Sequence, residues 1–151
     1  MKTLFQNRQA RFDYAIEASH TAGVLLEGWE VKSLLNSQAT FNAGNAFVRF
    51  KDGEAWLEAF TIQPMASTAK GLLVERQPLR SRKLLLTRHE LDKLQAKVAI
   101  SGYTVVPLEI TYDRRIHVVI GVGKGKKKHD KRDTIKQREQ SRDLQRQLKA
   151  L

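Results

Sequence analysis

Few side chains in this chain of 151 residues could support catalysis or bind a metal ion. There is no cysteine, and no two histidines stand at the spacing that metal sites use. The histidines are His20, His89, His117 and His129. Glu90 and Asp92 fit the first turn of a helix, where the helix dipole favours acids, and Glu27 and Glu30 fit surface or hydrogen-bonding roles better than an acid–base pair. We therefore expect no enzyme, cofactor, metal site or small-molecule substrate.

One glycine-rich stretch, residues 121–126, could be taken for a phosphate-binding loop. Such a loop needs four residues between its first glycine and a Gly-Lys-Ser/Thr sequence, and then a helix. Only three residues separate Gly121 from Gly125, and neither serine nor threonine follows Lys126. The spacing favours a flexible hinge over a nucleotide pocket.

Basic residues are the strongest chemical signal. Lysine and arginine number 27 against 16 acidic residues, a net charge of +11. Residues 124–151 hold 11 of the basic residues and 4 of the acidic ones. An excess of one sign repels itself unless a polyanion offsets it, and nucleic acid or an anionic membrane surface could be that polyanion. The distribution predicts a body, residues 1–123, and a basic C-terminal tail, residues 124–151.

The tail has too few apolar residues to hold a helix against a core, but it is rich in good helix formers. We expect it to be disordered in solution and helical when bound. Within it, His129 could stack on a base.

Two smaller basic groups lie in the body. Arg80, Arg82 and Lys83 precede a predicted helix, and Arg8 and Arg11 precede a predicted strand. Each group alone is compatible with a solvated surface. Together with the tail, the two groups indicate that several separate parts of the chain bind the phosphates of a nucleic acid. His117 could equally lie at the edge of the core or face RNA.

The N-terminus lacks the apolar segment of a signal peptide, and no apolar run approaches the roughly 20 residues of a membrane span. We expect a cytoplasmic protein with no membrane partner.

The elements that would position these residues are mostly strands. Alternating and β-branched residues predict strands at 12–17, 22–26, 46–50, 54–61, 103–112 and 115–122. Asp52-Gly53 is a strong hairpin signal between two of them. Residues 30–35 fit two helical turns, and residues 67–77 fit a loop.

The clearest predicted helix covers residues 88–101. Thr87 fits its N-cap, Glu90 would complete a capping box, and Gly102 fits the position after its end. Short strands with flanking helices predict a mainly β fold, a closed antiparallel β-barrel of the OB-like type.

Several segments resemble those of the small protein B (SmpB) family, in order and over nearly the whole chain. They are residues 7–11 with 14–17, residues 22–23 and 28–34, residues 52–54, 79–86 and 102–108, and residues 121, 125–127, 130–132 and 135–139. The sequence departs from the family pattern at Thr21, where an acidic residue is common, and at His117, where lysine is common.

The resemblance implies an OB-like barrel that binds the tRNA-like domain of transfer-messenger RNA (tmRNA) and delivers it to stalled ribosomes. It implies that the protein stands in for the missing anticodon stem, while the tail probes the empty mRNA channel and the decoding centre. A generic structured-RNA or ribosomal RNA-binding protein is the alternative.

Motif position assigns two sets of residues. The set expected to bind tmRNA is Asn7, Arg8, Arg11, Glu30, Lys32, Arg80, Arg82, Lys83 and Leu85. Glu30 cannot bind phosphate, so it would accept a hydrogen bond from RNA or orient Lys32 or Arg11. The set expected to bind the ribosome is Lys124, Lys126, Lys127, Lys128, His129, Asp130, Lys131, Arg132, Ile135, Lys136 and Arg138.

Overall fold

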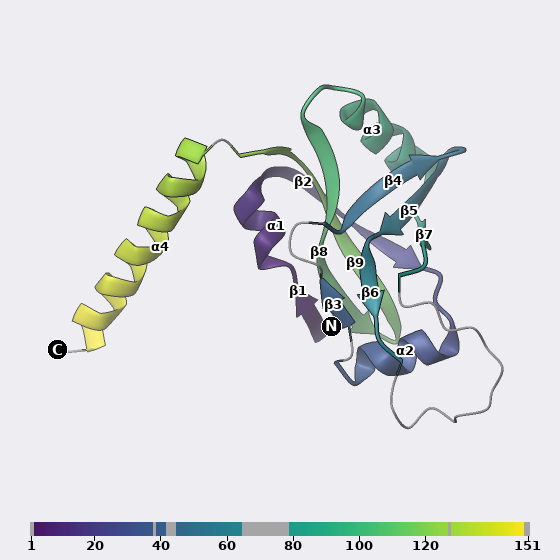
Figure 1. Ribbon diagram of the computed structural model, residues 1–151, viewed down its shortest axis with the longest axis horizontal. Coiled ribbons are helices and arrows are strands. Elements are labelled where there is room, and N and C mark those ends of the chain that lie inside the picture. Colours follow the sequence, from purple (N-terminus) through teal and green to yellow (C-terminus); the bar gives the residue numbers. More distant parts are fainter. Residues whose placement is uncertain (1, 38, 42–44, 65–78, 127, 150–151) are drawn as a thin grey trace.

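Among the described residues, seven strands form one antiparallel sheet, the centre of the fold (Figure 1). The computed structural model describes residues 2–37, 39–41, 45–64, 79–126 and 128–149. In sheet order the strands are β1 (Lys2–Gln6), β8 (Tyr103–Asp113), β9 (Arg115–Gly125), β2 (Tyr14–Val24), β7 (Arg82–Leu85), β5 (Glu54–Glu58) and β4 (Phe47–Lys51). A separate ribbon pairs β3 (Ala39–Phe41) with β6 (Phe60–Ile62).

The described residues also form four helices: α1 (Arg8–Asp13), α2 (Gly28–Leu35), α3 (Arg88–Val98) and α4 (Lys128–Lys149). The expected mainly β fold with flanking helices is therefore confirmed. Of the described helices, none is long and apolar enough to cross a membrane.

The expected closed barrel is wrong. Within the described residues the sheet has two unpaired edges, β1 and β4. Strand β4 lies close to β8, but among the described residues no hydrogen-bonded pairing joins these two strands. The sheet therefore curls over its core without closing.

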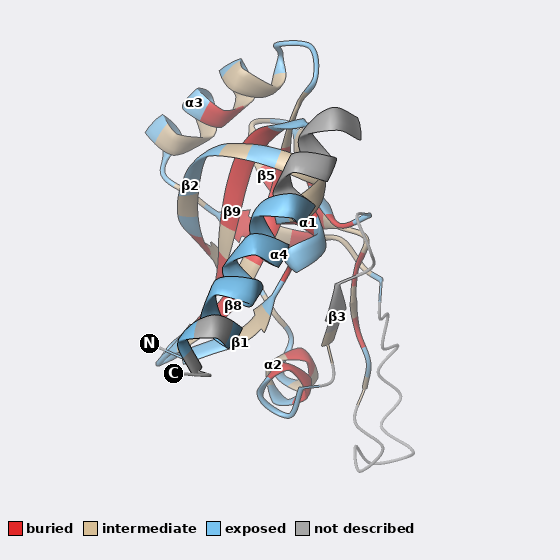
Figure 2. Ribbon diagram, turned by 90° about the vertical axis from the view of Figure 1, so that its left-hand side faces the viewer, coloured by how far each residue is buried: buried red, intermediate tan, exposed pale blue. Residues whose placement is uncertain are grey.

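The core lies on the inner face of this curled sheet. Figure 2 shows the buried residues gathered along the strands, whereas α4 is exposed. Alternate residues of β9 point inward, among them Val118 and Ile120, and they meet Ile110 of β8. Helices α2 and α3 cover this core through Leu34 and Leu94. Each such buried aliphatic side chain stabilises the fold by about 1.5–3 kcal/mol.

The N-terminal segment differs from the prediction. Phe12 belongs to α1 rather than to a strand, and the strands expected at 12–17 and 22–26 are the two ends of the single strand β2. Asn7 explains the difference, because its Oδ1 accepts from Ala10 N at 3.2 Å and so caps α1. Its Nδ2 also donates to Pro107 O at 2.9 Å, which fastens α1 to β8. Strands β1, β3 and β7 were not predicted, and the single strand expected at 54–61 is divided between β5 and β6, which belong to different sheets.

The hairpin at Asp52-Gly53 and the start of α3 agree with their predictions from the sequence. Asp52 and Gly53 both have positive φ, 54° and 74°, and they join β4 to β5. Thr87 caps α3, accepting from Glu90 N at 3.2 Å. The helix ends at Val98, earlier than expected, and Gly102 (φ 88°) lies in the turn that leads to β8. The predicted loop at residues 67–77 lies outside the described residues.

The glycines near the end of β9 are not a hinge. β9 continues to Gly125 and pairs with β2 along this length. A Cβ atom at Gly123 would lie 2.3 Å from the Ala15 carbonyl oxygen, and one at Gly121 would lie 2.7 Å from Leu108 Cδ1. These two glycines are required by close packing. Near Gly125 the space is open.

Helix α4 projects from the end of β9 (Figure 1). It contacts α1, where the Arg138 guanidinium lies 5.8 Å from the centre of the Phe12 ring. Ile135, Leu144 and Leu148 of α4 are exposed.

Candidate nucleic-acid interface

An apolar groove lies where the end of β2, helix α2, strand β7 and the turn between β8 and β9 meet. Its volume is about 440 Å³. Leu25, Leu35 and Leu85 line it and are exposed by 50%, 43% and 48%. Three exposed leucines in one groove favour a ligand surface, because apolar side chains are otherwise scattered over a protein surface. The predicted contact Leu85 is therefore available to a ligand.

Strand register builds the floor of this groove. Gly23 of β2 pairs with Leu85 on one side and with His117 on the other. A Cβ atom at Gly23 would lie 3.2 Å from Leu85 Cβ. The absence of a side chain at Gly23 therefore leaves space in the groove between Leu85 and His117. His117 lies in the groove lining, where its Nδ1 is buried and has no hydrogen-bond partner among the described residues. Thr21 is exposed on the same face of β2.

Two arginines at the groove were missed by the sequence analysis. Arg114 and Arg115 line it from the turn between β8 and β9, and both are exposed. Their signal was available, because a tight turn after a long strand presents its side chains at the surface. They give an otherwise apolar groove a cationic rim.

A buried ion cluster lies between α2 and β7. Glu30 and Arg82 are both 0% exposed, and Arg82 Nε donates to Glu30 Oε2 at 2.6 Å. Arg80 Nη2 and the Glu27 backbone N–H donate to Glu30 Oε1, and Arg82 Nη1 donates to Phe60 O. Burial lowers the pKa of Arg82, while Glu30 raises it.

This cluster changes how two predicted RNA contacts are interpreted. Glu30 and Arg82 present no side-chain surface to a ligand, and Glu30 orients Arg80 and Arg82 rather than Lys32 or Arg11. Both residues hold β7 against α2. The exposed members of the predicted set near the groove are Lys32 and Leu85, with Arg80 and Lys83 half-buried. Lys83 Nζ pairs with Glu54 Oε1 at 2.8 Å.

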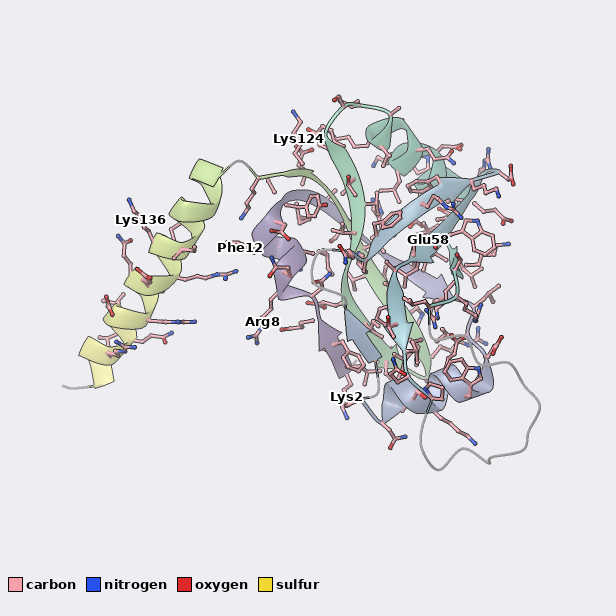
Figure 3. All side chains as sticks on the ribbon, in the orientation of Figure 1. Lys2, Arg8, Phe12, Glu58, Lys124 and Lys136 are labelled. Atoms are coloured by element: carbon pink, nitrogen blue, oxygen red, sulfur yellow. The ribbon has the colours of Figure 1, made fainter. Side chains whose placement is uncertain are left out.

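The remaining predicted contacts lie elsewhere. Arg8 and Arg11 are exposed on α1, whereas Asn7 is buried as the cap of that helix. Figure 3 shows Arg8 on the side of the molecule that faces α4, across the sheet from Glu58 on β5. The predicted RNA contacts therefore form two regions, one at the groove and one beside the tail.

An exposed cluster marks the place where the chain leaves the body. Tyr103 Oη donates to Glu17 Oε1 at 2.7 Å, and Lys97 Nζ lies 3.1 Å from Glu17 Oε2. The Lys97 and Lys124 ammonium groups lie 4.4 and 5.2 Å from the centre of the Tyr103 ring. The hydrogen bond from Tyr103 is the main cause that lowers the pKa of Glu17, and the same bond raises the pKa of Tyr103. The hydrogen bond to Glu17 raises the pKa of Lys97.

The tail residues continue from this cluster. Lys124 is exposed, and the backbone N–H of Lys126 donates to Asp13 O at 2.7 Å. Ile135, Lys136 and Arg138 are exposed on α4. Lys127 and the side chains of Lys128, His129, Asp130, Lys131 and Arg132 lie outside the described part of the chain.

Across the described residues, no three His, Asp or Glu side chains gather closely enough to hold a metal ion. Clustered basic residues at the rim of a groove and on a helix that follows the sheet are the electrostatic features expected of an RNA-binding protein.

Comparison with known proteins agrees with that class. The family model described as SmpB protein matches residues 4–150. An SsrA-binding protein of Synechococcus sp. (strain JA-3-3Ab) is 46% identical, over 99% of this chain and 95% of that protein. One of Pseudomonas putida (strain W619) is 44% identical, over 97% of this chain and 90% of that protein. The chain belongs to the SmpB family.

A solved structure is similar as well. It is described as "tmRNA-SmpB: a journey to the center of the bacterial ribosome", and the matching chain is 42% identical with a TM-score of 0.66. The match covers 82% of this chain and 85% of that chain.

Proposed function

We propose that this protein binds the tRNA-like domain of tmRNA and carries it to stalled ribosomes, where trans-translation rescues the ribosome and tags the incomplete peptide. The observation that carries the proposal is the similarity to SsrA-binding proteins over nearly the full length of the chain. The protein catalyses no reaction itself and acts in the cytoplasm.

The groove would receive the RNA. Its leucines offer an apolar surface on which an unpaired base can pack, and Arg114 and Arg115 offer charge to the flanking phosphates. Lys32, Arg80 and Lys83 would extend this phosphate-binding rim. Glu30 and Arg82 support the interface from beneath, since their mutual ion pair orders α2 and β7.

The tail would bind the ribosome and detect whether its mRNA channel is empty. Residues 124–151 would enter the vacant mRNA channel and place the basic residues of α4 against ribosomal RNA in the decoding centre. A tail that is disordered when free and helical when bound would become ordered only in a channel that holds no mRNA. Folding of the tail would therefore distinguish a stalled ribosome with an empty mRNA channel from a translating one. The disorder of the free tail stays a prediction, as does the division between body and tail at residue 123.

A competition experiment tests the proposal. Labelled tmRNA bound to the protein at about 0.2 M salt, where nonspecific phosphate contacts are weakened, is challenged with excess tRNA or an unrelated RNA hairpin. We expect the complex to survive both competitors. Equal displacement by both would identify a generic structured-RNA-binding protein instead.

A further inference from the structure

The outer face of β4, β5 and β7 carries an aromatic side chain between two cations. In strand register, Trp56 of β5 pairs with Arg49 of β4 and with Lys83 of β7. Ala55 and Leu57 beside it are buried, so the alternation of strand β5 points Trp56 away from the core. Phe47, diagonal to Trp56 on the same face, is 38% exposed.

The indole of Trp56 has no assigned role in the fold. It is partly exposed, and among the described residues it makes no hydrogen bond. A partly exposed ring on the outer face of an antiparallel sheet, with cations on both sides, is the arrangement on which RNA-binding sheets stack unpaired bases.

The charges around the ring are balanced. Arg49 Nη2 lies 3.1 Å from Glu58 Oε1, and Lys83 Nζ lies 2.8 Å from Glu54 Oε1. Glu58 Oε2 also accepts from Ser81 Oγ at 2.7 Å. A locally neutral surface would attract a phosphate chain only weakly. It suits a single nucleotide, because the cations can meet its phosphate while a carboxylate accepts a hydrogen bond from an amino group of its base.

This surface is continuous with the groove. Lys83 and Leu85 stand on the same face of β7, and Leu85 lines the groove. The backbone N–H of Leu25, another lining residue, donates to Lys83 O at 2.9 Å. RNA seated in the groove therefore has a direct path along the outer face of the sheet to Trp56.

We propose that Trp56, flanked by Arg49 and Lys83, forms a second RNA subsite that stacks one unpaired nucleobase of the RNA held in the groove. This inference rests on the proposed function. It adds Arg49 and Trp56 to the residues that contact RNA, and it converts Lys83 from a general phosphate contact into one side of a defined base platform.

Two proteins with one tryptophan each test the subsite. The chain contains only two tryptophans, so Trp29→Phe leaves Trp56 as the only indole, and Trp56→Phe leaves Trp29 as a matched control. Each protein is titrated with the labelled tRNA-like domain of tmRNA, and anisotropy of the RNA reports binding while indole fluorescence reports stacking. We expect strong quenching in the Trp29→Phe protein and a clearly smaller change in the Trp56→Phe protein.

Affinity provides the second measurement. Trp56→Leu, which retains an apolar side chain but no ring, is expected to weaken RNA binding about tenfold, within the range that base–aromatic stacking provides. Trp56→Phe should lose less, since it keeps a ring, and thermal melting of both variants checks that they fold.

The outcomes separate the two proposals. Saturated RNA binding with unquenched Trp56 and unchanged affinity of folded Trp56→Leu would overturn the subsite and leave the proposed function standing. Quenching of Trp56 that occurs only on ribosomes would assign this face to the ribosome and also overturn the subsite. No RNA binding by anisotropy would overturn both.

Discussion

Glu30 lies at the centre of the buried ion cluster between α2 and β7. Its buried carboxylate faces two guanidinium groups and also accepts from the backbone at the start of α2. Removing one partner of a buried ion pair leaves the other partner charged and desolvated, which costs far more than the net contribution of the pair. In the proposed function, Glu30 would contribute to binding through the position of its neighbours.

We expect Glu30→Gln to lower the free energy of unfolding by about 3–5 kcal/mol, because Arg82 would keep its charge without a buried counter-ion. Urea unfolding measures this change. Glu27→Gln is the matched control, since Glu27 is 45% exposed and its ion pair with Arg80 is expected to contribute no more than about 1 kcal/mol. Equal losses of unfolding free energy in the two variants would show that the buried ion pair stabilises the fold no more than the exposed one.

The hydrogen bond from Tyr103 favours the ionised form of Glu17 and so lowers its pKa. The folded-state pKa of Glu17 is lowered, so its contribution to stability is present above the unfolded pKa, about 4.3, and is lost as the pH falls through the folded pKa. Lys97 and Tyr103 have raised pKa values. Their contributions are present below their unfolded pKa values, about 10, and are lost as the pH rises through the folded values.

We expect Tyr103→Phe to raise the pKa of Glu17, because the hydrogen bond that chiefly lowers it disappears. Carboxyl chemical shifts followed by NMR over acidic pH measure this change. Tyr112→Phe on the same strand is the control and should leave the Glu17 titration unchanged. An unaltered titration in Tyr103→Phe would refute the role of the phenol.

At the scale of elements, β9 determines where the body ends. It pairs with β2 as far as Tyr14 and Gly125, and with β8 as far as Tyr103 and Lys124. Its close approach to β2 leaves no room for a side chain at Gly123. Gly121 and Gly123, which resemble part of a hinge in the sequence, thus lie where β9 is paired with both β2 and β8.

Gly123→Ala should destabilise the fold by about 1–3 kcal/mol, since the new methyl group overlaps the Ala15 carbonyl and the strands must separate. Thermal or urea unfolding measures the loss. Gly125→Ala, two residues further along the same strand, has open space around it and should change stability by well under 1 kcal/mol. A hinge would instead tolerate alanine equally at both positions.

At the scale of the whole molecule, the basic surface is divided between the groove and the side that carries α1 and α4. Two separate basic regions suit a protein that holds one RNA while it meets another. Residues 124–151 carry 11 basic residues in the sequence, so removal of this tail should affect one partner more than the other.

Truncation after Lys126 should preserve the fold, because β9 and the contact of Lys126 with Asp13 remain. We expect unchanged thermal stability, nearly unchanged binding of tmRNA and loss of peptide tagging on stalled ribosomes. Truncation after Gly121 should unfold or strongly destabilise the protein, since it removes strand pairs with both β2 and β8. Tagging by the protein that ends at Lys126 would contradict the role of the tail.

Local signals determined much of this protein from the sequence alone. The Asp52-Gly53 hairpin, the Thr87 cap, the strands β8 and β9 and the uneven charge depend on neighbours along the chain, so composition and periodicity predict them. The motifs that resemble the SmpB family belong to the same class of information, and the match to that family confirms them.

The positions of the groove and outer-face residues, the burial of charged side chains and the open sheet depend on contacts between residues far apart in the sequence. Only strand register could place Leu85 beside His117 across Gly23 and align Trp56 with Arg49 and Lys83. Charge in the sequence does not distinguish the buried Arg82 from the exposed Arg8, because burial depends on what the fold packs over a side chain. Closure likewise depended on pairing: among the described residues β4 lies close to β8 but forms no hydrogen-bonded pairs with it, which leaves the sheet open.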